Sequence, residues 1–285
     1  MKWLESVLLF LDSQMQIPEL FGWYHLLWLG ITAAVTVLAW KLGPKLNKKQ
    51  VNHIVLATAL VVIALEVVKQ VNFSFRVDDN GIIADYQWYA FPFQFCSTPM
   101  YVGLLVGLIR KGRLYDHLAA YLATYAVFAG FAVMIYPANV YVGTISINIQ
   151  TMICHASMIP IGALLYSSGV VKASHATLGK AAWVFTFGVI LAAVMNEVAY
   201  RTGITDGETF NMFLISPYCD PSLPVYSLVQ QVVPFPASLI IYILGFTAAA
   251  EIMLLLAMAC RHAALSGKKI HQASLTSTPL FAIMR

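Results

Sequence analysis

Charged side chains are scarce in this chain. Asp, Glu, Lys and Arg make up 11% of its 285 residues, whereas hydrophobic residues make up 60%. A soluble domain that hides its apolar surface inside one core does not have this composition. The chain is therefore predicted to be a polytopic membrane protein.

Cysteine is also scarce, and its spacing excludes two further classes. The four cysteines are Cys96, Cys154, Cys219 and Cys260, and no two of them form a CxxC motif. Two lie within long apolar stretches, which is not the placement of a disulfide framework. Histidine and the acidic residues show no metal-ligand spacing such as HxxxH. We expect no metal site, and nothing in the sequence calls for a cofactor.

Long apolar runs dominate the chain instead. A membrane-spanning helix needs about 20 mostly apolar residues. Seven segments meet this requirement, near residues 21 to 41, 52 to 72, 91 to 110, 114 to 136, 146 to 167, 181 to 201 and 234 to 259. We predict an all-α, polytopic membrane protein with seven transmembrane helices.

The predicted fold is a single membrane domain over residues 1–285. Residues 1–20 form an amphipathic amino-terminal segment, because charges alternate with Trp3, Leu4 and Phe10 in a stretch too short to span. Residues 21–259 form the seven-helix bundle. Residues 260–285 form a basic tail.

Basic residues indicate the orientation. With seven spans, four clusters of Lys and Arg fall on one side, around residues 41–49, 110–113, 172–180 and 261–285. Cytoplasmic loops carry such an excess, so the amino terminus is predicted outside and the carboxyl terminus in the cytoplasm. The expected location is the plasma membrane. These anchors also explain the net charge of +4, so we expect no nucleic-acid partner.

Two outer segments are longer than simple turns. They cover residues 73–89 and 202–233, and the second contains several prolines. Loops of this length often act as lids, although a plain surface loop explains them equally well.

Cys96 and His155 are reactive side chains within apolar stretches. A free cysteine is often a small buried hydrophobe, and a lone histidine in a span is usually a satisfied hydrogen-bonding group. Cys96, however, follows Pro92 in a short polar run at the outer end of its segment, where free amide groups favour a thiolate. A neutral imidazole is suited to take a thiol proton. If packing brings them together, the two residues form a nucleophile and its base.

Other polar residues of the spans gather at the same predicted depth. Ionisable groups in spans are costly and usually face an interior cavity. The outer half of the bundle is predicted to hold His25, Glu66, Gln94, Ser97, Thr98, Asn196, Glu197 and Arg201. Glu66 with Lys69, and Glu197 with Arg201, have the spacing of neutralising ion pairs on one helix face. The convergence of several spans favours a polar cavity that opens toward the outer leaflet.

Three short motifs resemble a known family. The run Phe91-Pro92-Phe93-Gln94-Phe95-Cys96, the segment around His155, and Phe210-Asn211-Met212-Phe213-Leu214 are similar to the YwaF-like bacterial integral membrane proteins. The eukaryotic relatives of that family are the transmembrane-protein-164 phospholipid acyltransferases. The resemblance implies a lipid acyltransferase with a Cys96 and His155 catalytic pair.

The chain departs from the family pattern at two places. The family commonly has His-Leu-Cys where this chain has Gln94-Phe95-Cys96. It also commonly has Asn-Tyr-Met-Phe-Leu, so Asn211 stands one place later here. Any task of the first histidine therefore passes to Gln94 or is absent here, and Asn211 is kept as a candidate supporting residue.

The leading hypothesis is acyl transfer from a phospholipid ester through a Cys96 thioester to a lysolipid or another hydroxyl acceptor. Gln94, Ser97, Thr98 and Asn196 are candidate oxyanion donors, and Glu66 or Glu197 is a candidate partner that orients His155. Water as acceptor would make the protein a lipid hydrolase. The alternatives are a transporter or binding protein that uses the same outer cavity, and a scaffold subunit. The sequence lacks an internal repeat, which counts mildly against a transporter.

Overall fold

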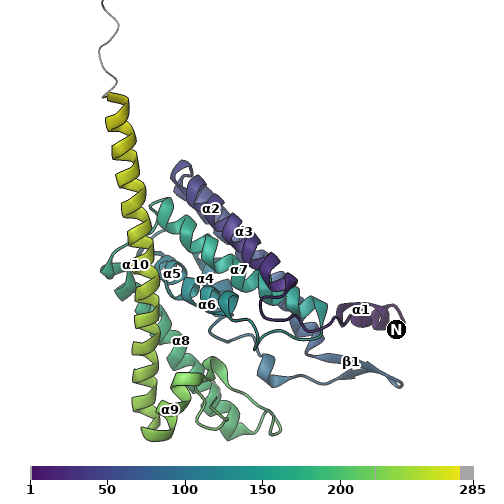
Figure 1. The fold of residues 1–285 in the computed structure, drawn as a ribbon. Helices are drawn as coiled ribbons and strands as arrows, with labels where there is room; N and C mark the ends of the chain where they lie inside the picture. The colour runs from purple at the N-terminus through teal and green to yellow at the C-terminus, as the bar shows by residue number, and fades with distance from the viewer. Residues whose placement is uncertain (1, 222, 277–285) are drawn as a thin grey trace, which may run out of the picture.

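The fold is a bundle of helices, seen in a computed structural model that describes residues 2–221 and 223–276 (Figure 1). The helices are α1 (Lys2–Leu11), α2 (Trp23–Leu42), α3 (Lys48–Asn72), α4 (Thr98–Ile109), α5 (Arg113–Ala123), α6 (Tyr125–Ile135), α7 (Ile145–Ser167), α8 (His175–Thr202), α9 (Pro224–Val232) and α10 (Phe235–Thr276). Three 3-10 turns join them, η1 (Gly43–Lys45), η2 (Trp88–Ala90) and η3 (Met212–Leu214). A short antiparallel hairpin, β1 (Phe75–Asp78) with β2 (Gly81–Ala84), lies in a loop that the sequence did not mark as strand.

Six helical segments of the described chain are long and apolar enough to cross a membrane. They are Trp23–Lys45, Lys48–Asn72, Arg113–Ile135, Ile145–Ser167, His175–Thr202 and Phe235–Ala263. The third of these joins α5 and α6 across a break at Thr124. The multi-pass membrane class predicted from the sequence is confirmed.

The segment expected to span near 91 to 110 differs from the other six. Its helix α4 has 12 residues, from Thr98 to Ile109, which corresponds to about 18 Å. A helix of that length does not reach across a hydrocarbon layer of about 30 Å. Because α4 begins at Thr98, Cys96 precedes the helix and does not lie within a spanning helix as expected.

Local sequence explains where two of the long helices begin and end. At the start of α3, the Asn47 side chain accepts a hydrogen bond from the Gln50 amide, and the Gln50 side chain accepts one from the Asn47 amide. This reciprocal capping satisfies two donors that a helix start leaves free. At its other end, α8 stops at Gly203, whose left-handed backbone (φ 63°) glycine adopts without strain.

Helix α7 is the centre of the bundle. It packs against α2, α3 and α6, and Figure 1 shows α2, α3 and α7 running side by side. The contact with α6 is close because Gly130 has no side chain. A Cβ atom at Gly130 would lie 2.6 Å from the His155 carbonyl oxygen and 2.8 Å from Met158 Cβ.

The ends of the bundle differ in their contacts. At one end, Lys48 lies 4.0 Å from the ring centroid of Tyr115, and Ser167 lies against the Gly43 turn. The basic residues around 41–49, 110–113 and 172–180 lie in the turns of this end and in the helix ends that flank them. At the opposite end, the amino-terminal segment pairs with residue 144 through Gln14, and Asn72 donates to the Ser146 hydroxyl at 2.7 Å.

Helix α10 is much longer than the other helices. It has 42 residues and projects past α2, α3 and α7 (Figure 1). The predicted basic tail, residues 260–285, therefore continues this helix as far as Thr276, and residues 277–285 lie outside the described residues. Glu251 of α10 lies against the start of α8, since its Oε1 is 2.8 Å from His175 Nδ1.

Replacing Gly130 with alanine tests the close packing of α6 on α7. The new methyl group would meet a backbone oxygen that cannot move aside without shifting α7. Overpacking of this kind costs about 1–3 kcal/mol, so we expect the melting temperature in detergent to fall by several degrees.

Gly30→Ala is the matched control. A Cβ at Gly30 has no neighbour within 4 Å in the described chain, so this variant should melt at or slightly above the wild-type temperature. Equal melting temperatures for both variants would contradict the packing described for Gly130.

Candidate functional site

The non-helical segment Phe91–Ser97 is the centre of the candidate site. A lipid-surrounded backbone must have its polar groups satisfied by the protein. Three carbonyl groups of this segment accept hydrogen bonds from side chains: Pro92 from Tyr101 at 2.8 Å, Phe95 from Thr98 at 2.8 Å, and Cys96 from the Cys154 thiol at 3.6 Å. The segment is thus built into the bundle in an unwound form.

The bond from Cys154 places the Cys96 main chain against α7. Cys154 is buried, whereas the Cys96 side chain is partly exposed. His155 follows Cys154 directly and points about 100° away around the helix. The structure therefore brings the two segments of the predicted pair together, with Cys154 as the point of contact.

His155 has one nitrogen committed and one free. Its Nδ1 lies 2.7 Å from the Thr151 carbonyl oxygen. A carbonyl oxygen can only accept, so Nδ1 carries the proton and Nε2 carries the lone pair. The side chain is 4% exposed, and within residues 2–221 and 223–276 the buried Nε2 has no hydrogen-bond partner. Nε2 can therefore accept a proton, and no donor of the described residues occupies its lone pair.

His25 is different, because both of its nitrogens are used. The Phe21 amide donates to Nδ1 at 3.0 Å, and Nε2 donates to the Met134 carbonyl oxygen at 2.8 Å. The side chain is fully buried. His25 therefore ties the start of α2 to the end of α6, which is a structural task.

Glu66 is the acceptor of a buried polar cluster between α3 and α7. Lys69 Nζ lies 2.9 Å from its Oε1, Gln70 donates to the same oxygen at 2.8 Å, and Gln150 donates to Oε2 at 2.8 Å. Both oxygens are occupied in this way. His155 is oriented by Thr151 instead of by Glu66.

Tyr86 extends this cluster toward the end of the bundle. Its hydroxyl donates to Gln70 Oε1 at 2.9 Å. Burial, assisted by the negative charge of Glu66, raises the pKa of Tyr86 above its usual value. The phenol consequently stays neutral and remains a donor at physiological pH.

Gln94 and Asn196 hold the η3 turn in place. Gln94 donates to the Asn211 carbonyl oxygen at 3.1 Å and accepts from the Phe213 amide at 3.0 Å. Asn196 donates to the Met212 carbonyl oxygen at 3.1 Å and accepts from its amide at 2.8 Å. Both amides are therefore committed to backbone groups and do not point donors at Cys96.

The η3 turn needs this support because its backbone is strained. Phe213 and Leu214 have φ values of 58° and 57°, a left-handed conformation that costs about 1–3 kcal/mol for residues of this type. Asn211, the shifted asparagine, accepts from the Ser216 amide at 2.9 Å and so caps the same turn. The Tyr242 hydroxyl donates to the Phe213 carbonyl oxygen at 2.9 Å.

The other two oxyanion candidates flank Cys96 on the α4 side. Thr98 donates to the Phe95 carbonyl and shares a short hydrogen bond with the Tyr121 hydroxyl, so its hydroxyl is occupied. Ser97 is 4% exposed and directly precedes α4. Of the four predicted donors, Ser97 remains the one next to the thiol.

Glu197 and Arg201 lie away from Cys96 and His155. They form an ion pair at the end of α8, and Tyr218 donates a hydrogen bond to Glu197. The Tyr200 ring stacks on Tyr218 at 3.6 Å between centroids. The Arg201 side chain is 75% exposed. This pair fastens the long loop after α8 and does not orient His155.

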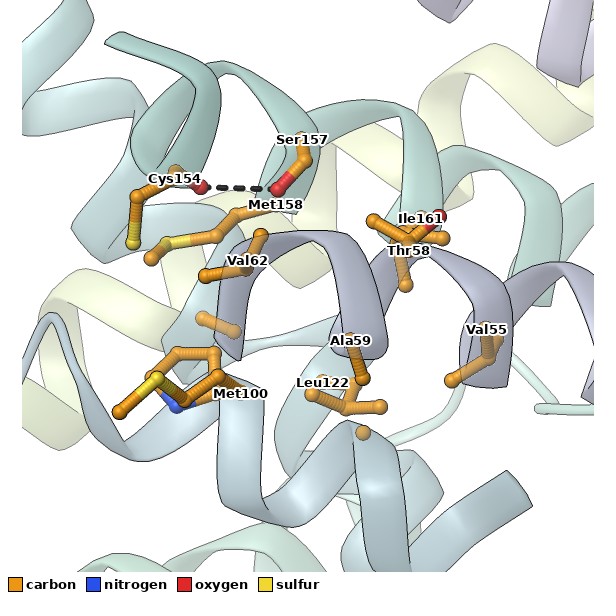
Figure 2. A pocket seen from close by; sticks show the side chains of 13 residues that line it. Val55, Thr58, Ala59, Val62, Met100, Leu122, Cys154, Ser157, Met158 and Ile161 are labelled. Carbon is orange, nitrogen blue, oxygen red and sulfur yellow. Dashed lines mark hydrogen bonds between the residues drawn. The ribbon is translucent and has the colours of Figure 1, made fainter. Parts of the chain in front are cut away.

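A small cavity lies beside Cys154. Figure 2 shows Cys154, Ser157, Met158 and Ile161 from α7 facing α3 and Met100 of α4. Its volume is about 30 Å³, roughly the space of one water. The cavity is too small for a lipid chain.

A metal site has no counterpart in the described residues, since no three His, Cys, Asp or Glu side chains gather there to hold an ion.

Sequence reasoning missed Cys154 and Gln150 as members of this region. Cys154 was counted there only among the free cysteines, yet its thiol is what contacts the Cys96 main chain. Gln150 lies one turn earlier on the same face of α7 and binds Glu66. That four-residue spacing was the available signal.

The fold and the site define a multi-pass membrane protein with an unwound, cysteine-bearing segment held inside its bundle. The chain belongs to the TMEM164 family, whose family model matches residues 20–259. This match confirms the transmembrane-protein-164 side of the resemblance noted in the sequence. No curated protein and no solved structure matches the chain.

Replacing Gln94 with alanine tests the support of the η3 turn. The change leaves the Phe213 amide and the Asn211 carbonyl without partners, which costs about 1–3 kcal/mol for each buried group. We expect the loop to open more often and Cys96 to react about tenfold faster with a small maleimide. The other three cysteines are first replaced by serine.

Gln87→Ala is the control, because the Gln87 side chain bonds to Tyr89 at the surface. It should leave the labelling rate of Cys96 unchanged. Equal rates for Gln94→Ala and the parent protein would show that the hydrogen bonds of Gln94 to the η3 turn do not control access to the thiol.

Proposed function

We propose that this protein is a membrane lipid acyltransferase with Cys96 as nucleophile and His155 as base. The observation that carries the proposal is the free Nε2 of His155, a buried acceptor on the residue next to the one that contacts Cys96. Membership of the TMEM164 family agrees with it. Nucleophile plus base is the arrangement that covalent catalysis needs.

The first half-reaction forms a thioester. His155 Nε2 takes the proton from Cys96 Sγ, and the thiolate attacks the carbonyl carbon of a phospholipid ester. A C–S bond forms, the ester C–O bond breaks, and the departing lysolipid oxygen receives the proton from the imidazolium. The oxyanion develops on the ester oxygen next to Cys96, and Ser97, which follows Cys96 directly, is the hydroxyl donor nearest to it in the sequence.

The second half-reaction transfers the acyl chain. The hydroxyl of a lysolipid or another acceptor gives its proton to His155 Nε2 and attacks the thioester carbon. A C–O bond forms, the C–S bond breaks, and the thiolate recovers the proton. Water in place of the acceptor would make the same residues a lipid hydrolase.

We also propose the number of membrane crossings and the orientation of the two termini. The six long helices, together with a seventh crossing made by the unwound segment Phe91–Ser97 and the short helix α4, cross the plasma membrane seven times, with the amino terminus outside and the carboxyl terminus in the cytoplasm. The grouping of basic loops at one end of the bundle supports this orientation. The YwaF-like motifs suggest a bacterial branch of the family.

A transporter or binding protein is the second candidate function. The feature that favours it is a cavity of about 440 Å³ between Tyr89, Gln94 and the loop after α8, lined in part by Glu208 and Asp220. It lies at the predicted outer end. A protein of this kind would bind a lipid there without forming a covalent adduct.

Adduct formation on Cys96 tests the acyltransferase. Purified protein is incubated with a phosphatidylcholine labelled in one acyl chain, and the hydroxylamine-sensitive label on the protein is measured. We expect no adduct in Cys96→Ala. In His155→Ala, loss of the base should slow the adduct about 100-fold or more.

Cys260→Ala is the matched control, because Cys260 is an exposed cysteine in α10. This variant should form the Cys96 adduct at the wild-type rate. An intact adduct in Cys96→Ala would refute the nucleophile. Reversible lipid binding without any adduct in the wild type would favour the transporter or binding protein.

A further inference from the structure

An apolar cavity lies on the membrane-facing side of α10. It occupies about 440 Å³ between α6, α9 and α10, and its walls include Phe128, Val229, Tyr242, Gly245, Phe246 and Ala249. Val225 and Ile241 line its rim and are 77% and 41% exposed. The cavity is therefore a groove that opens sideways from the bundle.

The two tyrosine hydroxyls of this groove form hydrogen bonds within the protein and are not left for a ligand. The Tyr242 hydroxyl donates to the Phe213 carbonyl oxygen, and the Tyr226 hydroxyl bonds to Ser238 at 3.0 Å. The wall is otherwise formed by apolar side chains and Gly245. A polar ligand would lose its water here without compensation, whereas a hydrocarbon would not.

The groove reaches the candidate site through one aromatic contact. The Phe246 ring, which forms part of its wall, meets the Phe95 ring edge to face at 5.1 Å between centroids. The Phe128 ring also meets Phe246 edge to face, at 5.7 Å between centroids. Phe95 directly precedes Cys96, so one contact between two rings joins the groove to the segment that carries the thiol.

Membrane depth indicates what fills the groove. Helices α6 and α10 belong to segments that are long and apolar enough to cross the membrane. Their surroundings at this depth are lipid chains. A groove of this size that opens into hydrocarbon is filled by hydrocarbon.

We propose that the groove between α6, α9 and α10 binds one acyl chain of the lipid substrate and that Gly245 sets the length of chain it accepts. This inference rests on the proposed acyltransferase function. A chain held behind Phe246 lies next to the segment that carries Cys96, which positions its ester for attack. A Cβ at Gly245 has no neighbour within 4 Å in the described chain, so the space beside it belongs to the groove.

Photocrosslinking tests the binding independently of the chemistry. The protein is reconstituted in nanodiscs that contain a phosphatidylcholine with a diazirine at the end of one acyl chain. We expect crosslinks concentrated on the α9 and α10 residues of the groove. Crosslinks spread evenly over the lipid-facing surface, or concentrated on helices other than α6, α9 and α10, would overturn the proposal.

Filling the groove tests the role of Gly245. The Gly245→Phe side chain would displace at least two methylene groups of a long chain, which lowers groove crosslinking about tenfold. The hydroxylamine-released chains should shift toward shorter lengths. Gly30→Phe is the matched control, since Gly30 lies on the exposed surface of α2 with equally open space.

The outcomes separate the two proposals. Groove crosslinks without any Cys96 adduct would refute the acyltransferase and leave lipid binding at this site. An adduct whose chain lengths are the same in Gly245→Phe and wild type would refute the groove and leave the catalytic pair. Ala249→Phe fills the same wall and replaces Gly245→Phe if that variant does not fold by size-exclusion chromatography.

Discussion

The need to satisfy backbone polar groups inside the membrane governs the rest of this structure. The segment Phe91–Ser97 leaves the helical conformation where the sequence predicts a span, and lipid offers no partner for the freed groups. Tyr101, Thr98 and Cys154 supply the missing donors. Because one donor is the thiol next to His155, the same requirement that stabilises the unwound segment also brings Cys96 to α7.

The loop after α8 completes this arrangement. Gln94 and Asn196 bind the strained η3 turn, which inserts Phe213 among aromatic rings of the bundle, including Phe95 at 6.0 Å. On its other side, Phe95 meets Phe246 and the apolar groove. The segment before Cys96 thus lies between a polar loop at one end of the bundle and an apolar groove open to lipid. A lipid ester, with its polar carbonyl and its hydrocarbon chain, matches both surroundings.

Much of the fold was predictable because hydrocarbon thickness imposes a length that the sequence displays directly. Six long helices and the membrane class follow from apolar runs. The short α4 did not follow, because composition alone does not separate a helix from an apolar unwound segment such as Phe91–Phe95. For the site, the sequence singled out the segments of Cys96 and His155, which the structure brings together through Cys154, and the catalytic roles of the two residues stay a prediction. The tasks of Gln94, Asn196 and Glu197 were not predictable, since an amide or carboxylate serves a backbone turn or a reaction equally well and the choice depends on tertiary contacts.

The central claim is that His155 Nε2 accepts the proton of Cys96. Its most direct test is the rate of Cys96 alkylation by a small neutral reagent as a function of pH, with the other cysteines replaced by serine, in the presence of His155 and in His155→Gln. The account predicts a rate near pH 7 that is about tenfold or more higher with His155 present, and equal rates at high pH, where the thiol ionises unaided. Profiles that superimpose over the whole range would contradict it.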